Sequence, residues 1–181
     1  PANYFHVLRR QIRRNFRKPL VIATPKSLLR HKKAVSTLEE FGPGTSFNRV
    51  LPDPGGLVAQ TKVKRVIICS GKVYYDLLAA RDEMNIFNVA LIRMEQLYPF
   101  PSVSLSKELK KYPNAEVIWC QEEPKNMGAW TYLDRRLEEL LDKIDIKAER
   151  PVYVGRPEAA SPATGSFDKH VREQKTLIEY A

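Results

Sequence analysis

The strongest constraint on the fold is an alternation, from residue 63 onward, of short apolar runs and segments with helical spacing. The apolar runs are rich in β-branched residues and lie at 63–69, 88–94, 117–120 and 152–154. The helical segments lie at 73–84, 104–112, 130–144 and 168–180, the last with Asp168 as the expected N-cap. Strands that alternate with helices are typical of βαβ units on a parallel sheet. We therefore predict an α/β fold with three layers, α/β/α, and a mostly parallel sheet of about five strands.

The chain begins with an amphipathic segment. Apolar residues recur at steps of four: Tyr4, Leu8, Ile12 and Phe16. Basic residues fall on the opposite side: Arg10, Arg13, Arg14 and Arg17. This pattern predicts a helix that ends before Pro19, because proline disfavours the α conformation in the residue before it. The run at 20–23 predicts a short buried strand, and the Gly- and Pro-rich region 41–62 predicts a long surface loop.

Charge divides the chain into two unequal parts. The first 38 residues carry ten Lys and Arg side chains and no acid, whereas the remainder holds 20 basic and 21 acidic side chains. A basic segment of this kind faces solvent, the phosphates of a nucleotide or an acyl-CoA, or acids of another subunit. Nucleic-acid binding is disfavoured because the aromatic residues lie on the apolar side of the helix, away from the arginines.

The two cysteines and the three histidines show no metal or catalytic spacing. Cys69 and Cys120 each end a strand-like run, which favours buried, reduced thiols in an intracellular protein. No apolar run reaches the roughly 18 residues of a membrane span, so we expect a soluble chain without membrane contact. The sequence has no HExxH helix, no GxSxG turn and no cluster of acids, so we expect no catalytic, cofactor-binding or metal-binding residue in it.

One turn between a predicted strand and a predicted helix has groups that suit an anion. Ser70, Gly71 and Lys72 offer a hydroxyl, free backbone N–H groups and an ammonium. The alternative is structural, with Ser70 as the helix N-cap and Gly71 in a tight turn. The spacing matches neither a P-loop nor a dinucleotide-binding turn.

A polar loop follows the third predicted strand. Its adjacent carboxylates, Glu122 and Glu123, could act as acid and base only if burial separated their pKa values. We favour a structural or subunit-contact role for this loop, with these candidate contacts: Gln121, Glu122, Glu123, Asn126 and Trp130.

Six runs in order resemble the C-terminal region of 2-oxoglutarate dehydrogenase E1. They are YFHVLRRQ (4–11), KPLVIATPKSLLRH (18–31), SGKVYYDLL (70–78), RMEQLYPFP (93–101), WCQEEPKNMGAW (119–130) and YVGRPEAASPATGS (153–166). The resemblance covers essentially the whole chain. It implies a transketolase-like C-terminal domain at 19–181, preceded at 1–18 by a basic helix that is the tail of another domain or a linker. The first residue, Pro1, agrees with a piece of a longer enzyme.

The resemblance also implies an activity to which this chain contributes without performing it. The family's E1 is a homodimer that uses thiamine diphosphate and magnesium, decarboxylates 2-oxoglutarate and passes the succinyl group to the lipoyl arm of the E2 dihydrolipoyl succinyltransferase. Those cofactors are held by preceding domains through a GDG-type motif, and no Gly-Asp-Gly occurs here. We expect this chain to build the dimer and to be inactive alone, in a bacterial cytoplasm or a mitochondrial matrix.

Some members of the family respond to nucleotides or acetyl-CoA, so the basic segment is a candidate site for AMP or acetyl-CoA, or an interface. The candidate residues are Arg10, Arg13, Arg14, Arg17, Lys18, Lys26, Arg30, Ser70 and Lys72. Two alternatives stay open. One is a close homologue that acts on 2-oxoadipate, and the other is a non-enzymatic domain that binds nucleotides or polyanions.

Overall fold

The computed structural model describes all 181 residues and divides into two compact units, Pro1–Asn48 and Arg49–Ala181. The units are treated separately below. The boundary expected after residue 18, between the tail of a preceding domain and the α/β domain, stays a prediction.

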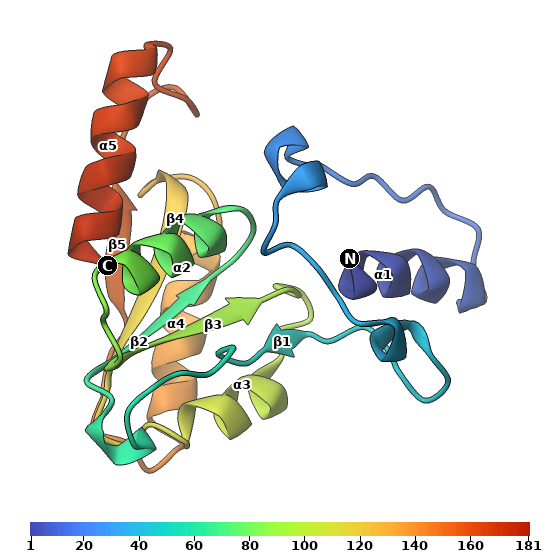
Figure 1. Ribbon diagram of the computed structural model, residues 1–181, viewed down its shortest axis with the longest axis horizontal. Helices are drawn as coiled ribbons and strands as arrows, with labels where there is room; N and C mark the ends of the chain where they lie inside the picture. The colour runs from blue at the N-terminus through green and yellow to red at the C-terminus, as the bar shows by residue number, and fades with distance from the viewer. The chain divides into compact units, whose positions relative to one another are not determined.

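The second unit is built on one five-stranded sheet with the order β1-β3-β2-β4-β5 (Figure 1). The strands are β1 (Val50–Leu51), β2 (Arg65–Cys69), β3 (Val89–Met94), β4 (Glu116–Pro124) and β5 (Val152–Arg156). All neighbouring pairs are parallel except β1 and β3, which are antiparallel. The predicted α/β fold with a mostly parallel sheet is confirmed.

Two hydrophobic cores lie on opposite faces of this sheet, because successive side chains of a strand point to opposite sides. One core joins alternate strand residues such as Val66, Ile68 and Trp119 to α3 (Ser102–Leu109) and α4 (Trp130–Leu141). The other joins Ile67, Cys69 and their neighbours to α2 (Val73–Glu83) and α5 (Phe167–Tyr180). In Figure 1, α2 and α5 accordingly lie on one side of the sheet and α4 on the other.

Three local expectations were wrong. The run at 20–23 forms no strand and is exposed, with 89% of Val21 accessible, because no other strand offers it hydrogen-bond partners. The fifth strand is instead β1, two residues inside the predicted loop 41–62. Helix α5 is capped by Ser166, whose Oγ accepts the N–H of Lys169, whereas Asp168 lies in its first turn.

The first unit contains α1 (Ala2–Arg13) and two 3₁₀ helices, Lys26–Arg30 and Leu38–Phe41. Helix α1 ends earlier than predicted, at Arg13, because Arg14 already has extended backbone angles. His6 Nε2 donates to the carbonyl of Glu40 at 2.8 Å, and the side chain of Asn3 exchanges two hydrogen bonds with the backbone of Asn48. Only Ala2 and His6 are buried in this unit, so it has almost no core of its own.

Candidate functional site

The candidate site in the second unit lies where the chain changes direction across the sheet. From β2 the chain passes to β3 on one side, and it then returns to β4 and β5 on the other. The end of β2 is therefore adjacent to β4, with Cys69 in register with Cys120, and β4 continues beyond it to Pro124. In open α/β sheets, ligands bind at this switch point, outside the carboxyl ends of the strands.

An ion pair joins the start of α2 to β4 at the switch point. Lys72 Nζ lies 2.7 Å from Glu122 Oε1 and 3.1 Å from Asp76 Oδ2. Partial burial opposes the charge of Lys72, but the hydrogen bonds to Glu122 and Asp76 outweigh it, so the pKa of Lys72 is raised. The ammonium predicted to meet an anion is thus already paired with two carboxylates of the same chain.

The Ser70 turn has the geometry of a tight turn and not of a helix cap. Gly71 has φ +78°, in the left-handed region that favours glycine. Lys72 occupies the N-cap of α2 and no side chain caps the helix, so the alternative reading of Ser70 as N-cap is wrong. Ser70 is half-buried.

Gln121 lies within β4, which extends to Pro124 and so past the predicted strand end at residue 120, and its side chain organises the loop that follows. Its Oε1 accepts hydrogen bonds from the indole N–H of Trp119 at 2.8 Å and from the backbone N–H groups of Ala129 and Trp130. Its Nε2 donates to three carbonyls: those of Glu123, Pro124 and Met127. Two of the N–H groups that the start of α4 leaves unpaired are satisfied in this way. The side chain is buried, so it shapes the loop from inside.

The other predicted contact residues lie between the end of β4 and the start of α4, and they are accessible to different degrees. Glu122 is half-buried in the ion pair with Lys72, whereas Glu123 is exposed. Asn126 pairs with the backbone of Ala159 through one donated and one accepted hydrogen bond, which ties this loop to the segment after β5. The Trp130 ring packs against Tyr153 at 5.2 Å between centroids.

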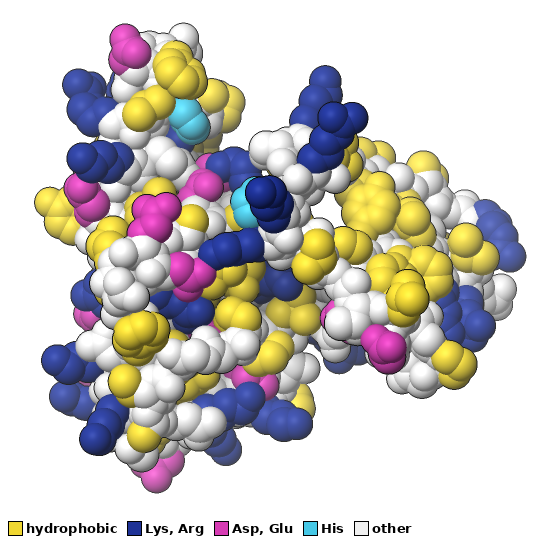
Figure 2. All heavy atoms as spheres, in the orientation of Figure 1, with side chains coloured by type: hydrophobic (Ala, Val, Ile, Leu, Met, Phe, Trp, Pro, Cys, Tyr) yellow, Lys and Arg dark blue, Asp and Glu magenta, His cyan; other side chains and the backbone are white.

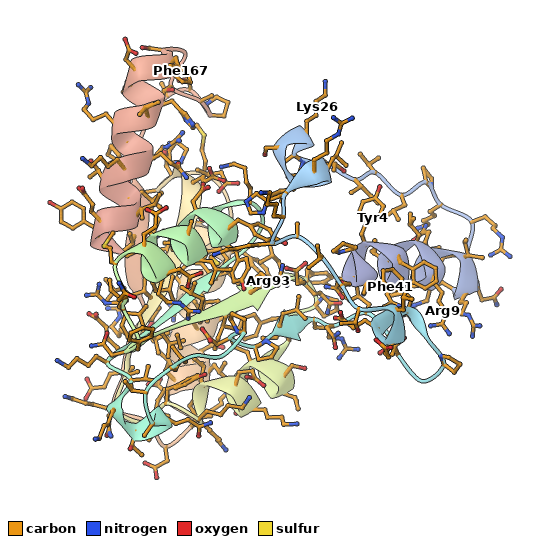
Figure 3. The ribbon with its side chains drawn as sticks, viewed as in Figure 1. Tyr4, Arg9, Lys26, Phe41, Arg93 and Phe167 are labelled. Atoms are coloured by element: carbon orange, nitrogen blue, oxygen red, sulfur yellow. The ribbon has the colours of Figure 1, made fainter.

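Two arginines at the ends of strands were not anticipated. The guanidinium of Arg93 (Figure 3) lies 4.4 Å from the centre of the Tyr74 ring and donates to the Tyr75 hydroxyl at 3.4 Å. Arg156 is buried and donates to His170 Nδ1 at 2.9 Å and to Gln174 Oε1 at 3.2 Å. No local pattern marks either residue, because their partners come from helices elsewhere in the chain.

Four of these polar residues form one network: Lys72, Asp76, Gln174 and Arg156. Gln174 Nε2 donates to Asp76 Oδ2 at 2.9 Å, so α5 is linked to the Lys72 ion pair and, through Arg156, to β5. Burial raises the pKa of the neighbouring Cys69 thiol well above its usual range and that of Cys120 to about 12. Both thiols therefore stay protonated, which disfavours reaction as nucleophiles. No three His, Cys, Asp or Glu side chains gather as metal ligands, and no helix is long and apolar enough to cross a membrane.

The basic residues predicted in the first unit divide into two groups. Two contact the unit itself: Arg10 lies 4.3 Å from the centre of the Phe47 ring, and Arg17 donates to the Arg14 carbonyl. Arg9, which was not a candidate, donates to the Thr45 carbonyl. The others are exposed and form no ion pair: Arg13, Arg14, Lys18, Lys26 and Arg30. The apolar side of α1 is also accessible, with 76% of Ile12 exposed, and Figure 2 shows apolar and basic side chains together on this surface.

Comparison with known proteins identifies the family. Residues 35–181 match the family described as 2-oxoglutarate dehydrogenase C-terminal. The chain belongs to this family. The 2-oxoglutarate dehydrogenase E1 component of Brucella anthropi is 54% identical over 189 aligned residues, which cover 100% of this chain and 19% of that protein. The corresponding protein of Brucella ovis is 53% identical over the same lengths. The resemblance predicted from the six runs is confirmed.

This member of the 2-oxoglutarate dehydrogenase C-terminal family spans about a fifth of the length of the curated relatives it matches. Among solved structures, a chain described as a split gene transketolase, inactive beta4 tetramer, matches with a TM-score of 0.49 and 16% identity. That match covers 78% of this chain and 44% of the other.

Proposed function

We propose that this chain is the C-terminal, non-catalytic domain of a 2-oxoglutarate dehydrogenase E1 component. The observation that carries the proposal is the similarity to E1 components along the whole chain. In the complete enzyme, E1 decarboxylates 2-oxoglutarate and transfers the succinyl group to the lipoyl arm of E2. The domain would contribute to the E1 homodimer through the end of β4, the loop after it and the start of α4, where the accessible candidates are Glu122, Glu123, Asn126 and Trp130.

The residues present do not fit the cofactor of such an enzyme. Thiamine diphosphate needs a magnesium ion held by oxygen ligands. The Gly-Asp-Gly motif through which the family holds both does not occur in this chain. The carboxylates nearest the switch point, Glu122 and Asp76, are both occupied by Lys72. We therefore assign thiamine diphosphate and magnesium to other domains of the enzyme and derive no catalytic step here.

A direct assay tests the non-catalytic role. The purified chain, supplied with 2-oxoglutarate, thiamine diphosphate and magnesium, is expected to release no carbon dioxide above a protein-free control. Deletion of the region that corresponds to 49–181 from a full-length E1 is expected to abolish both dimer formation and turnover. Decarboxylation by the isolated chain would contradict the proposal.

We assign the exposed basic residues of the first unit to an anionic contact, either an effector phosphate such as that of AMP or acetyl-CoA, or acids of a neighbouring domain. Arg13, Lys26 and Arg30 support this assignment because they are exposed and have no acidic partner. In full-length enzyme, Arg→Ala changes at 13, 17 and 30 would weaken effector binding if they hold phosphates. They would lower stability without changing effector affinity if they form a domain joint.

A polyanion-binding role is the second candidate, favoured by the same unpaired cations. Binding of random duplex DNA that weakens steeply with salt would support it, because phosphate contacts release counterions. We expect no such binding. The enzyme would work in the cytoplasm of a bacterium or in a mitochondrial matrix.

A further inference from the structure

The two edges of the sheet differ in whether their outer backbone groups have hydrogen-bond partners. At one edge, β1 pairs with β3, and beyond it the Asp53 carboxylate accepts the Leu91 N–H at 2.7 Å. Asp53 is held there by the buried guanidinium of Arg81. At the other edge, β5 pairs only with β4, so its outer N–H and C=O groups have no strand partner. An unpaired edge of this kind is a template for another extended chain.

A groove of about 450 Å³ runs along this open edge, between β5 and α5. The strand contributes Val152, Val154 and Gly155, and the helix contributes Arg172, Thr176 and Tyr180. The three helix residues are spaced four apart and therefore form one stripe. None of their polar side-chain groups makes a hydrogen bond or an ion pair, although each could do so. In Figure 1, the C-terminal half of α5 lies beside β5.

We propose that this groove binds a short, extended peptide segment that carries a carboxylate. The segment would add to β5 as a sixth strand, with its acid opposite Arg172. The open edge favours an extended backbone, since strand addition supplies the hydrogen bonds that β5 lacks. Pro151 and Pro157 flank the strand, so the ladder is limited to the five residues of β5.

The charge of Arg172 favours a segment that carries a carboxylate. Arg172 has no acidic partner, whereas the one acid that lines the groove, Glu173, already lies 3.6 Å from both Arg156 and Lys169. An incoming carboxylate would therefore meet uncompensated positive charge. Val152 and Tyr180, which are 41% and 70% exposed, offer apolar contact to side chains of the same segment.

A second copy of this chain is a poorer occupant. Two-fold pairing of β5 with β5 would bring the Arg172 side chains of two copies toward each other, so two positively charged grooves would face one another. Like charges across such a contact disfavour it. This inference does not depend on the proposed role in an E1 component.

Binding of defined peptides tests the proposal. The probe is a fluorescein-labelled, N- and C-blocked octapeptide of alternating valine and glutamate, titrated against the 181-residue chain by fluorescence polarisation. The control peptide has lysine in place of glutamate. We expect saturable binding of the acidic peptide alone. Arg172→Glu should weaken this binding at least about tenfold, because a charge-assisted hydrogen bond is lost. Lys175→Glu, an exposed change on the same helix outside the groove, should leave it unchanged.

Backbone addition has its own readout. Two further peptides carry N-methyl groups on alternate residues, one on each edge of the extended strand. Only the peptide methylated on the edge that faces β5 should lose binding, because that methyl group removes the ladder donors. Amide shifts in NMR spectra should fall on β5 and α5.

Four results would overturn the proposal. They are equal binding of the lysine peptide, equal effects of Arg172→Glu and Lys175→Glu, insensitivity to N-methylation on either edge, and no binding up to about 1 mM peptide. A dimer in sedimentation that Arg172→Glu disrupts would also reject it, in favour of a second copy on this face.

Discussion

Gln121 shows how a single buried amide can hold a loop in place. Its two polar atoms satisfy the Trp119 indole, two N–H groups at the start of α4 and three carbonyls. A glutamine is suited to this position because it donates and accepts from one planar group. A buried residue with this many partners leaves several groups unsatisfied when it is replaced.

We predict that Gln121→Leu lowers the free energy of unfolding by about 2–4 kcal/mol, because the Trp119 N–H and several backbone groups lose partners in a buried site. Gln121→Glu should also destabilise, since a carboxylate accepts hydrogen bonds but cannot donate to three carbonyls. Urea unfolding of the variants measures both effects. Glu123→Gln, an exposed change on the same loop, should stay within about 0.5 kcal/mol. A loss below about 1 kcal/mol in Gln121→Leu would contradict this role.

At this scale, the sequence indicated residue types but not their partners. Lys72 and Glu122 were both singled out, yet their ion pair depends on β2 and β4 being neighbours. Arg156 was missed because its partners, His170 and Gln174, lie on a helix that packs back over β5. A contact between distant segments leaves no local periodicity in either of them.

At the scale of elements, the periodicity of apolar residues predicted which segments form strands and helices with a buried face. The strands from β2 onward and the helices α2 to α5 were found near their predicted positions, because each has an apolar pattern that the two cores require. The run at 20–23 shows the limit of this reasoning. Its residues are apolar, but they pair with no strand of the chain. Strand β1, with two residues, is too short to show any period.

The junction of β4 and β5 is packed so closely that a methyl group would not fit. A Cβ at Gly155 would lie 2.4 Å from the Tyr153 hydroxyl oxygen and 2.8 Å from the Gln121 carbonyl oxygen. The Tyr153 hydroxyl donates to the Arg156 carbonyl at 2.8 Å, so it cannot move away without losing that bond.

Gly155→Ala is therefore expected to destabilise the second unit by about 1–3 kcal/mol through overpacking. Gly165→Ala is a comparison in which crowding plays no part, because nothing lies within 4 Å of its Cβ position, and its positive φ alone should cost about 1–2 kcal/mol. Thermal unfolding of the two variants compares them. A Gly155→Ala chain as stable as the parent would show that Tyr153 moves aside at no cost.

At the scale of the whole molecule, the two units differ in how much they bury. The first buries only Ala2 and His6, and its helix α1 has 12 residues. The second holds both hydrophobic cores. Helices of this length are marginal in water without tertiary packing.

We predict that residues 49–181 alone unfold cooperatively with a midpoint close to that of the whole chain. A peptide of residues 1–48 should show little helical circular dichroism, since it lacks a core that offsets its conformational entropy. Loss of the cooperative transition on removing 1–48 would mean that the second unit depends on the first.

The buried thiols predict a dependence of stability on alkaline pH. Burial raises the pKa of Cys120 from 9.0 to about 12, so the native state holds its proton after the unfolded state has released it. This contribution to stability is complete below pH 9.0 and is lost as the pH rises toward 12. Cys69 changes in the same direction.

The free energy of unfolding should therefore fall between about pH 9 and about pH 12, by up to about 1.4 kcal/mol per pH unit for each thiol. Urea unfolding across this range measures the slope. Cys120→Ala should reduce it, whereas Glu123→Gln should not. Equal slopes for the parent and Cys120→Ala would refute the assignment.

By itself, the sequence determined the fold class, the family and which residues could form the two cores, because these depend on local periodicity and on runs of residues that can be read along the chain. Only the tertiary structure decided that Lys72 is occupied by Glu122, that Gln121 is internal, and that one sheet edge is closed by Asp53 while β5 stays open. These features depend on strand order and register. They place together residues far apart in sequence, and no local pattern specifies such pairs.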